Sequence, residues 1–129
     1  MYENGKIYMG LAGGKRVELA LNMCNRHGLI AGASGTGKTV TMKVMAESFS
    51  DAGVPVFLCD VKGDVAGICA PGQSSEGMEK RIDKFGLRDR FVYQGYPTTF
   101  WDVYQEGGHA VRATVSDMGP ELLSPILGL

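Results

Sequence analysis

The stretch that decides the fold spans residues 32 to 39 and reads Gly32-Ala33-Ser34-Gly35-Thr36-Gly37-Lys38-Thr39. It fits the pattern G-x-x-x-x-G-K-[ST] at every fixed position, which is the pattern of a phosphate-binding loop, or P-loop. Its glycines allow backbone angles that turn successive N–H groups toward an anion, and a helix starting nearby adds the positive end of its dipole. We therefore predict that the phosphates of a nucleotide bind here.

Each residue type in the motif has an expected part in binding ATP and Mg²⁺. Lys38 brings a positive charge to the β- and γ-phosphates, which makes it the predicted catalytic residue. Thr39 offers a hydroxyl ligand to Mg²⁺. The predicted nucleotide-binding residues are those of the motif and the one that follows it: Gly32, Ala33, Ser34, Gly35, Thr36, Gly37, Lys38, Thr39 and Val40.

The segments on either side of the loop predict a βαβ unit. Residues 27–31 read as a short strand before it, and apolar residues at intervals of four predict a helix over 38–50. Gly53 is the expected C-terminal cap of that helix. Residues 54–59 are an uninterrupted apolar run, which is typical of a parallel strand buried on both faces.

The other segments predict shorter elements around this unit. Two short strands, over residues 6–9 and 17–21, flank a Gly13-Gly14 turn. Further along the chain we expect a loop over 60–72, a polar helix over 75–85 with Ser75 as its cap, and a strand over 91–93. A β pair is expected over 99–104 and 109–115, joined by Glu106-Gly107-Gly108. The last predicted element is a helix over 120–127, with its apolar residues facing inward: Leu122, Leu123, Ile126 and Leu127.

Length and composition are those of one soluble globular domain: 129 residues, 44% hydrophobic and 21% charged. The net charge of −1 argues against an overall basic surface for nucleic acid, although a local basic patch is compatible with it. The sequence has no apolar run of about 20 residues and no signal-peptide pattern, so we expect no membrane partner and a cytoplasmic location. Cys24, Cys59 and Cys69 lack metal or disulfide spacing and are expected to be reduced thiols.

Asp60 is a second candidate for the site, because it follows the apolar residues 56–59 in the form of a Walker B strand, whose carboxylate holds Mg²⁺. Ligands of open α/β sheets lie beyond the carboxyl ends of the strands, which would bring Asp60 near the phosphates. The alternative is an aspartate that ends a strand or forms a turn. Lys62, Gly63 and Asp64 either contact a nucleotide, a neighbouring subunit or a polymer, or they form a solvated turn.

Longer stretches resemble the HerA–FtsK superfamily of ATPases, and most closely a bacterial HerA-like branch of poorly defined function. The resemblance covers nearly the whole chain. It is carried by the residues that lead into the P-loop (25–32), by those around the next apolar run (53–58 and Asp60-Val61-Lys62-Gly63-Asp64), and by residues 100–103 and 111–120.

The resemblance implies a RecA-like, three-layer α/β fold with a mostly parallel sheet, Mg-ATP hydrolysis, and a homo-oligomeric ring, a hexamer, of a kind that often moves DNA. It also implies that the Walker B aspartate and the catalytic glutamate lie on a later strand, and no apolar strand ending in Asp-Glu occurs here. The chain would then be the N-terminal portion of a single P-loop NTPase domain, with a β-rich lead-in over 1–26 and the core over 27–129. Asp60 would be an auxiliary residue at most.

Two other functions remain open. A phosphotransferase of the kinase or GTPase type would use Asp60 as its magnesium ligand, with residues 54–59 directly beside the P-loop strand; in the motor another strand intervenes. In the second alternative, the chain by itself binds a nucleotide but does not hydrolyse it. Phe100, Trp101 and Tyr104 offer stacking surfaces for a base, but we interpret them as the core of the β pair. His27 and His109 have no second ligand at metal spacing and are interpreted as structural or surface residues.

Overall fold

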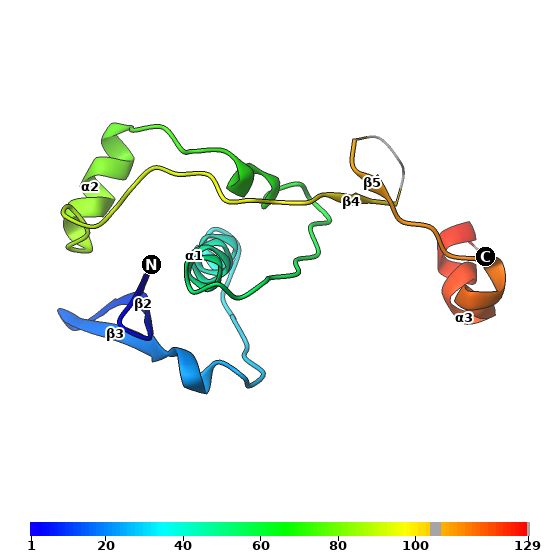
Figure 1. Cartoon of the computed structure of the whole chain (residues 1–129), viewed down its shortest axis with the longest axis horizontal. Coiled ribbons are helices and arrows are strands. Elements are labelled where there is room, and N and C mark those ends of the chain that lie inside the picture. Colours follow the sequence, from blue (N-terminus) through cyan, green and yellow to red (C-terminus); the bar gives the residue numbers. More distant parts are fainter. Residues whose placement is uncertain (104–106, 129) are drawn as a thin grey trace. The chain divides into compact units, whose positions relative to one another are not determined.

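The computed structural model describes residues 1–103 and 107–128, and these divide into two compact units, Met1–Pro97 and Thr98–Leu129. Both units combine helices with strands, so the predicted α/β character of the chain is confirmed (Figure 1). Within the described ranges, no helix combines the length and the hydropathy needed to span a membrane.

A three-stranded antiparallel sheet begins the first unit, in the order β1 (Tyr2–Glu3), β2 (Lys6–Ala12) and β3 (Lys15–Ala20). β2 and β3 are joined by Gly13 and Gly14, whose φ angles of 56° and 77° are those of the tight turn that suits the twist of a hairpin. Glycine adopts these angles without a steric penalty. The two predicted strands are confirmed, although β3 ends one residue early in a short 3₁₀ turn, Leu21–Met23.

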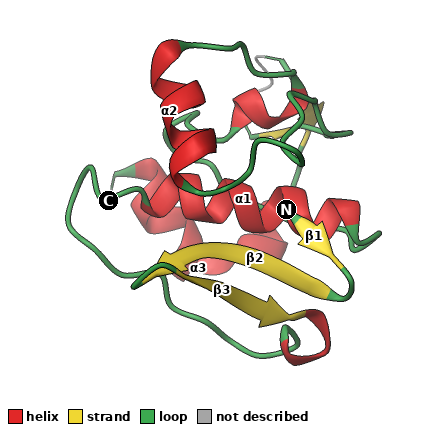
Figure 2. Cartoon of the chain, turned by 90° about the vertical axis from the view of Figure 1, so that its left-hand side faces the viewer, coloured by secondary structure: helices red, strands yellow, loops and turns green. Residues whose placement is uncertain are grey.

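The helix α1 (Lys38–Asp51) packs across this sheet and forms the core of the first unit with it (Figure 2). Ile7 of β2 is fully buried, as is Ser48 of α1, whose hydroxyl donates to the carbonyl oxygen of Val44. Burying an isoleucine side chain such as that of Ile7 stabilises the fold by about 1.5–3 kcal/mol. The helix was predicted to within one residue, and Gly53 follows it with a left-handed φ of 76°, as a C-terminal cap requires.

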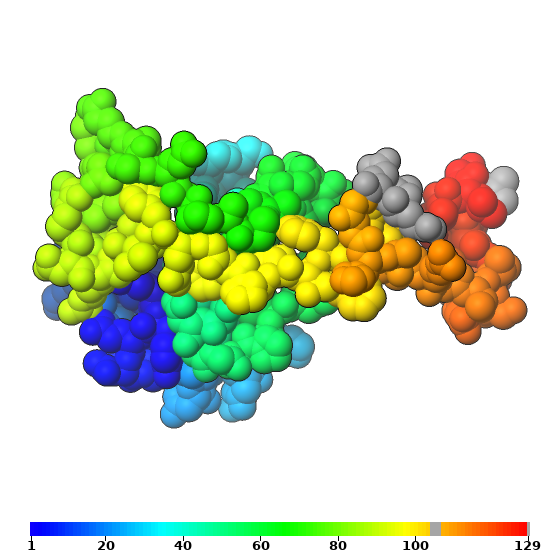
Figure 3. Space-filling model, turned by 45° about the horizontal axis from the view of Figure 1, so that its top comes forward, coloured from blue at the N-terminus to red at the C-terminus, as the bar shows by residue number. Residues whose placement is uncertain are grey.

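The helix α2 (Glu76–Lys84) also confirms its prediction. Ser75 caps it, since its hydroxyl oxygen accepts a hydrogen bond from the backbone N–H of Met78 at 3.3 Å. Ile82 is its buried residue. Residues 91–96, yellow in Figure 3, then return beside the green residues 66–69, which form a 3₁₀ turn, Ala66–Cys69. The N–H of Tyr96 donates to the carbonyl oxygen of Ile68 at 2.9 Å.

The strands predicted for the parallel sheet are not formed. Residues 27–31, 54–59 and 91–93 carry no strand pairing in the structure, and the apolar run expected to be buried is open to solvent, with Phe57 81% exposed. A parallel strand is buried only when neighbouring strands flank it and helices cover both faces of the sheet. The described residues supply no such neighbours here, so the RecA-like sheet is not confirmed.

The second unit contains β4 (Trp101–Asp102), β5 (His109–Ala110) and α3 (Val115–Leu127). The predicted β pair is present but much shorter than expected, and its strands are parallel. Tyr104 and Glu106, which the prediction also included, lie outside the described residues. Phe100 and Trp101 are exposed, so their interpretation as the core of the pair is wrong.

The helix α3 starts earlier than its predicted first residue, Pro120. Thr114 forms a capping box with Asp117, and a first turn follows before Gly119, whose φ of 65° kinks the helix ahead of Pro120. The apolar face that was predicted to point inward is exposed at Leu122, Ile126 and Leu127. The prediction that this face points inward is therefore wrong for these residues.

Candidate functional site: the phosphate-binding loop

The first turn of α1 presents free backbone donors at the end of the predicted P-loop. The first hydrogen bond of the helix is donated by Thr41 to the carbonyl oxygen of Gly37, at 2.9 Å. Within the described residues, the N–H groups of Lys38, Thr39 and Val40 find no acceptor, as expected for a helix start. These donors share the positive end of the helix dipole, which is a favourable place for an anion.

The three glycines of the motif are needed for two different reasons. Gly35 and Gly37 have φ angles of 78° and 95°, which side chains with a Cβ rarely adopt. Gly32 is needed for space, because a Cβ there would lie 2.5 Å from Oγ1 of Thr36. Glycine at these positions therefore allows the loop to keep this conformation.

Lys38 extends back over the loop from the first residue of α1. Its Nζ donates hydrogen bonds to the carbonyl oxygens of Gly32, at 2.9 Å, and Ala33, at 2.8 Å. The hydroxyl of Thr36 donates to the same carbonyl of Ala33 at 2.7 Å. Because an ammonium group has three donors, Lys38 keeps one for an anion.

Thr39 is half-buried beside Lys38. Among residues 1–103 and 107–128, its hydroxyl has no hydrogen-bond partner, which leaves both oxygen lone pairs free for a cation. Its position in the first turn of α1 puts this hydroxyl next to the free N–H groups. The chemistry of the predicted magnesium ligand therefore fits its place in the fold.

Asp60 organises its own loop. Its Oδ2 accepts hydrogen bonds from the N–H groups of Val65, at 2.8 Å, and Ala66, at 3.2 Å, and its Oδ1 accepts one from Asp64, at 3.1 Å. These hydrogen bonds hold the pKa of Asp60 below its ordinary value, and the bond from Val65 has the largest effect. The geometry is that of the turn-forming aspartate, and among the described residues no hydrogen bond or ion pair joins Asp60 to the P-loop.

Residues 61–64 are exposed in the same loop, which agrees with a solvated turn. Strand order was expected to distinguish the phosphotransferase from the motor. In the phosphotransferase, residues 54–59 lie directly beside the P-loop strand; in the motor, another strand lies between the two. Neither segment forms a strand in the structure. A direct magnesium role for Asp60 therefore remains a prediction.

A cavity of about 460 Å³ beside the loop was missed by sequence reasoning. It lies within the first unit, between α1, β2, the end of α2 and residues 87–96. The regular spacing of Val40 and Val44 on α1 was the one signal for it, although that face was interpreted simply as the packed side of the helix. Its lining includes Thr36, Gly37, Val40, Thr41, Val44, Tyr8, Met9, Arg81, Ile82 and Phe85.

The other predicted residues form no further site. Cys24, Cys59 and Cys69 are free thiols, as predicted. His109 stacks at a tilt on Trp101, with the ring centroids 5.8 Å apart. Over the two described ranges, no group of three or more His, Cys, Asp or Glu side chains is placed to hold a metal ion.

Comparison with known proteins identifies a family. A family model described as "Helicase HerA-like C-terminal" matches residues 8–129, which is well over half of the chain and includes the whole P-loop. No curated protein and no solved structure matches.

Proposed function

We propose that this chain, which belongs to the helicase HerA-like C-terminal family, binds Mg-ATP through residues 32–40. The observation that carries the proposal is the convergence of donors at the start of α1. The N–H groups of Lys38, Thr39 and Val40 and the third donor of the Lys38 ammonium all lie at one helix end, next to glycines that keep the loop open. Such a set of donors fits the closely spaced oxygens of a polyphosphate.

The roles of the individual residues follow from this geometry. Phosphate oxygens compete with the carbonyls of Gly32 and Ala33 for the ammonium of Lys38, and a charged acceptor makes the stronger hydrogen bond. Lys38 therefore neutralises charge on the terminal phosphates. Thr39 holds Mg²⁺ through its hydroxyl, and the ion, when bound, neutralises charge that develops on the phosphates. Asp60 shapes its own loop and serves the site at most indirectly.

For the intact protein, we infer ATP hydrolysis by a RecA-like domain in a hexameric ring that moves DNA. Family membership supports this inference. In that arrangement we propose that the chain contributes the first part of the P-loop NTPase domain. The free thiols of Cys24, Cys59 and Cys69 support a reducing compartment, the cytoplasm.

Calorimetry with Mg-ATP tests the binding proposal directly. Replacing Lys38 by alanine removes charged hydrogen bonds worth about 1.5–3 kcal/mol, so we expect affinity to fall about tenfold or more. Lys43→Ala is the matched control, because it removes the same charge from the same helix outside the loop. Equal affinities of the two variants for Mg-ATP would contradict the proposal. ATPase activity that depends on Lys38 and rises with DNA, measured on the intact protein, tests the motor.

A further inference from the structure

The carbonyl oxygen of Ala33 is shared by three donors within the P-loop. It accepts hydrogen bonds from the backbone N–H of Thr36 at 3.4 Å, from the hydroxyl of Thr36 at 2.7 Å and from the ammonium of Lys38 at 2.8 Å. A carbonyl oxygen has two lone pairs, so these donors compete for it. The ammonium can therefore give up its bond to Ala33 without leaving that oxygen without a donor.

The carbonyl oxygen of Gly32 has no such substitute donor. Among the described residues, its hydrogen bond comes from the ammonium of Lys38 alone, at 2.9 Å. The two bonds that fold Lys38 back over the loop are thus unequal, because the hydroxyl of Thr36 already bonds to the Ala33 carbonyl and no described group does so at Gly32. Of the two carbonyls, Lys38 releases that of Ala33 at the lower cost.

Gly32 provides the space in which the Thr36 hydroxyl reaches Ala33. A Cβ on residue 32 would lie 2.5 Å from Oγ1 of Thr36, which is closer than a Cβ approaches another atom in real structures. The hydroxyl is therefore packed against the Gly32 backbone while it donates to the Ala33 carbonyl. In this orientation the donor of Thr36 is used within the loop, so Thr36 is placed to act on Lys38 rather than on an anion.

Access of water decides when the Thr36 hydroxyl matters. Ala33 and Thr36 are exposed, so water can bond to a carbonyl that Lys38 releases as long as the loop faces solvent. A polyphosphate that covers the loop displaces this water, and a carbonyl left without a donor then costs free energy. The Thr36 hydroxyl removes that cost at Ala33. Its contribution therefore falls on nucleotide binding and not on the stability of the fold.

We propose that Thr36 is a positioning residue for Lys38, an inference that rests on the proposed function. Its hydroxyl keeps the Ala33 carbonyl hydrogen-bonded while the ammonium keeps its bond to Gly32 and turns the donor that held Ala33 toward the terminal phosphate. Together with its third donor, Lys38 then offers two charged hydrogen bonds to the anion instead of one. Thr36 acts through Lys38 and need not touch the nucleotide.

A double-mutant cycle between Thr36 and Lys38 tests the proposal on the chain, with the affinity for Mg-ATP as its readout. Thr36→Ala removes the hydroxyl, and we expect the affinity to fall about threefold, the effect of one neutral hydrogen bond. In the Lys38→Ala background the same substitution should leave the affinity unchanged, because that variant has no ammonium to position. Calorimetry measures the stronger complexes, and phosphorus NMR of ATP measures the weak ones.

Thr36→Ser is the matched variant, because it differs from Thr36→Ala by the hydroxyl alone. It should bind Mg-ATP as the wild type does, and all three proteins should unfold at the same temperature, since the loop is exposed. An unchanged affinity in Thr36→Ala, a loss that Thr36→Ser shares, or an equal loss with and without Lys38 would overturn the positioning role alone. A wild-type chain that does not bind Mg-ATP would overturn the proposed function, and this inference with it.

Discussion

The side-chain nitrogen of Lys38 lies 2.9 Å from the carbonyl oxygen of Gly32, the first residue of the motif, and donates a hydrogen bond to it. The bond joins the helix start to the beginning of the loop and closes residues 32–38 into a ring. A second bond, to Ala33, strengthens the closure. The lysine that is proposed to bind phosphate therefore also holds the loop in its conformation. Substitutions at Lys38 or Gly32 should affect both the loop conformation and phosphate binding.

Replacing Gly32 by alanine should impair nucleotide binding through loop geometry. The added Cβ would lie 2.5 Å from Oγ1 of Thr36, so either this hydroxyl rotates and loses its hydrogen bond to Ala33, or the loop shifts and misplaces the Lys38 contact. We expect the affinity for Mg-ATP, measured by calorimetry, to fall at least several-fold. Gly28→Ala serves as the control, because a Cβ there meets no atom within 4 Å. Recovery of affinity in the double variant Gly32→Ala, Thr36→Ala would identify the clash as the cause.

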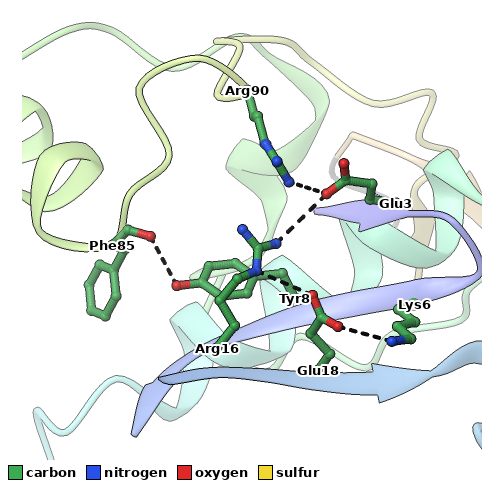
Figure 4. A network of polar contacts seen from close by, with 7 residues as sticks. All are labelled: Glu3, Lys6, Tyr8, Arg16, Glu18, Phe85 and Arg90. Carbon is green, nitrogen blue, oxygen red and sulfur yellow. Dashed lines mark hydrogen bonds and ion pairs between the residues drawn. The ribbon is translucent and has the colours of Figure 1, made fainter. Parts of the chain in front are cut away.

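Replacing Tyr8 by phenylalanine should destabilise the first unit. The Tyr8 side chain is buried, and loss of its hydroxyl leaves the Phe85 carbonyl without that hydrogen bond while the ring stays under Arg16. The expected cost is about 1–2 kcal/mol in the free energy of unfolding, measured with urea. Tyr2→Phe is the control, since the Tyr2 hydroxyl has no partner within the described residues. A variant as stable as the wild type would mean that the contact in Figure 4 does not hold sheet and α2 together.

Replacing Ser75 by alanine should destabilise α2. Its hydroxyl oxygen accepts the N–H of Met78 at 3.3 Å, and loss of such a cap typically costs about 1 kcal/mol. Thermal unfolding followed by circular dichroism measures the change. Ser75→Asp keeps an acceptor and adds a negative charge at the positive end of the helix, so it should retain wild-type stability. Equal losses in both variants would argue against the cap.

Asp60→Asn should lower stability at neutral pH and have little effect in acid. Backbone hydrogen bonds, that of Val65 first, lower the pKa of Asp60 from its ordinary value of 3.8. The stabilisation by the carboxylate is therefore fully present above pH 3.8 and is lost as the pH falls through the lower pKa of the folded state.

Urea unfolding of the Asp60→Asn variant and the wild type, from about pH 7 down to about pH 3, should show a difference that narrows toward the acid end. Asp64→Asn, in the same loop, is the control, because the side chain of Asp64 makes no hydrogen bond in the described part of the chain. A difference that stays constant with pH would contradict the role of the charge.

Local patterns predicted the elements that depend on nearby residues. The helix start after Gly37, the cap at Ser75 and the glycine turn at Gly13 and Gly14 each involve groups only a few residues apart. Predictions that needed a distant partner were less successful. The run at 54–59 was expected to be a buried strand, and the face of α3 with Leu122 and Ile126 was expected to be packed, but both are exposed.

The features of the P-loop site also divide into those set by neighbouring residues and those set by the tertiary structure. The sequence by itself determined where a phosphate should bind, because the glycines, the lysine and the helix start are consecutive and their geometry is local. Tertiary structure alone decided that β2, the end of α2 and residues 87–96 lie around α1 and leave a cavity next to Gly37. Burial and enclosure depend on which distant segments meet, and no short pattern of residues specifies that.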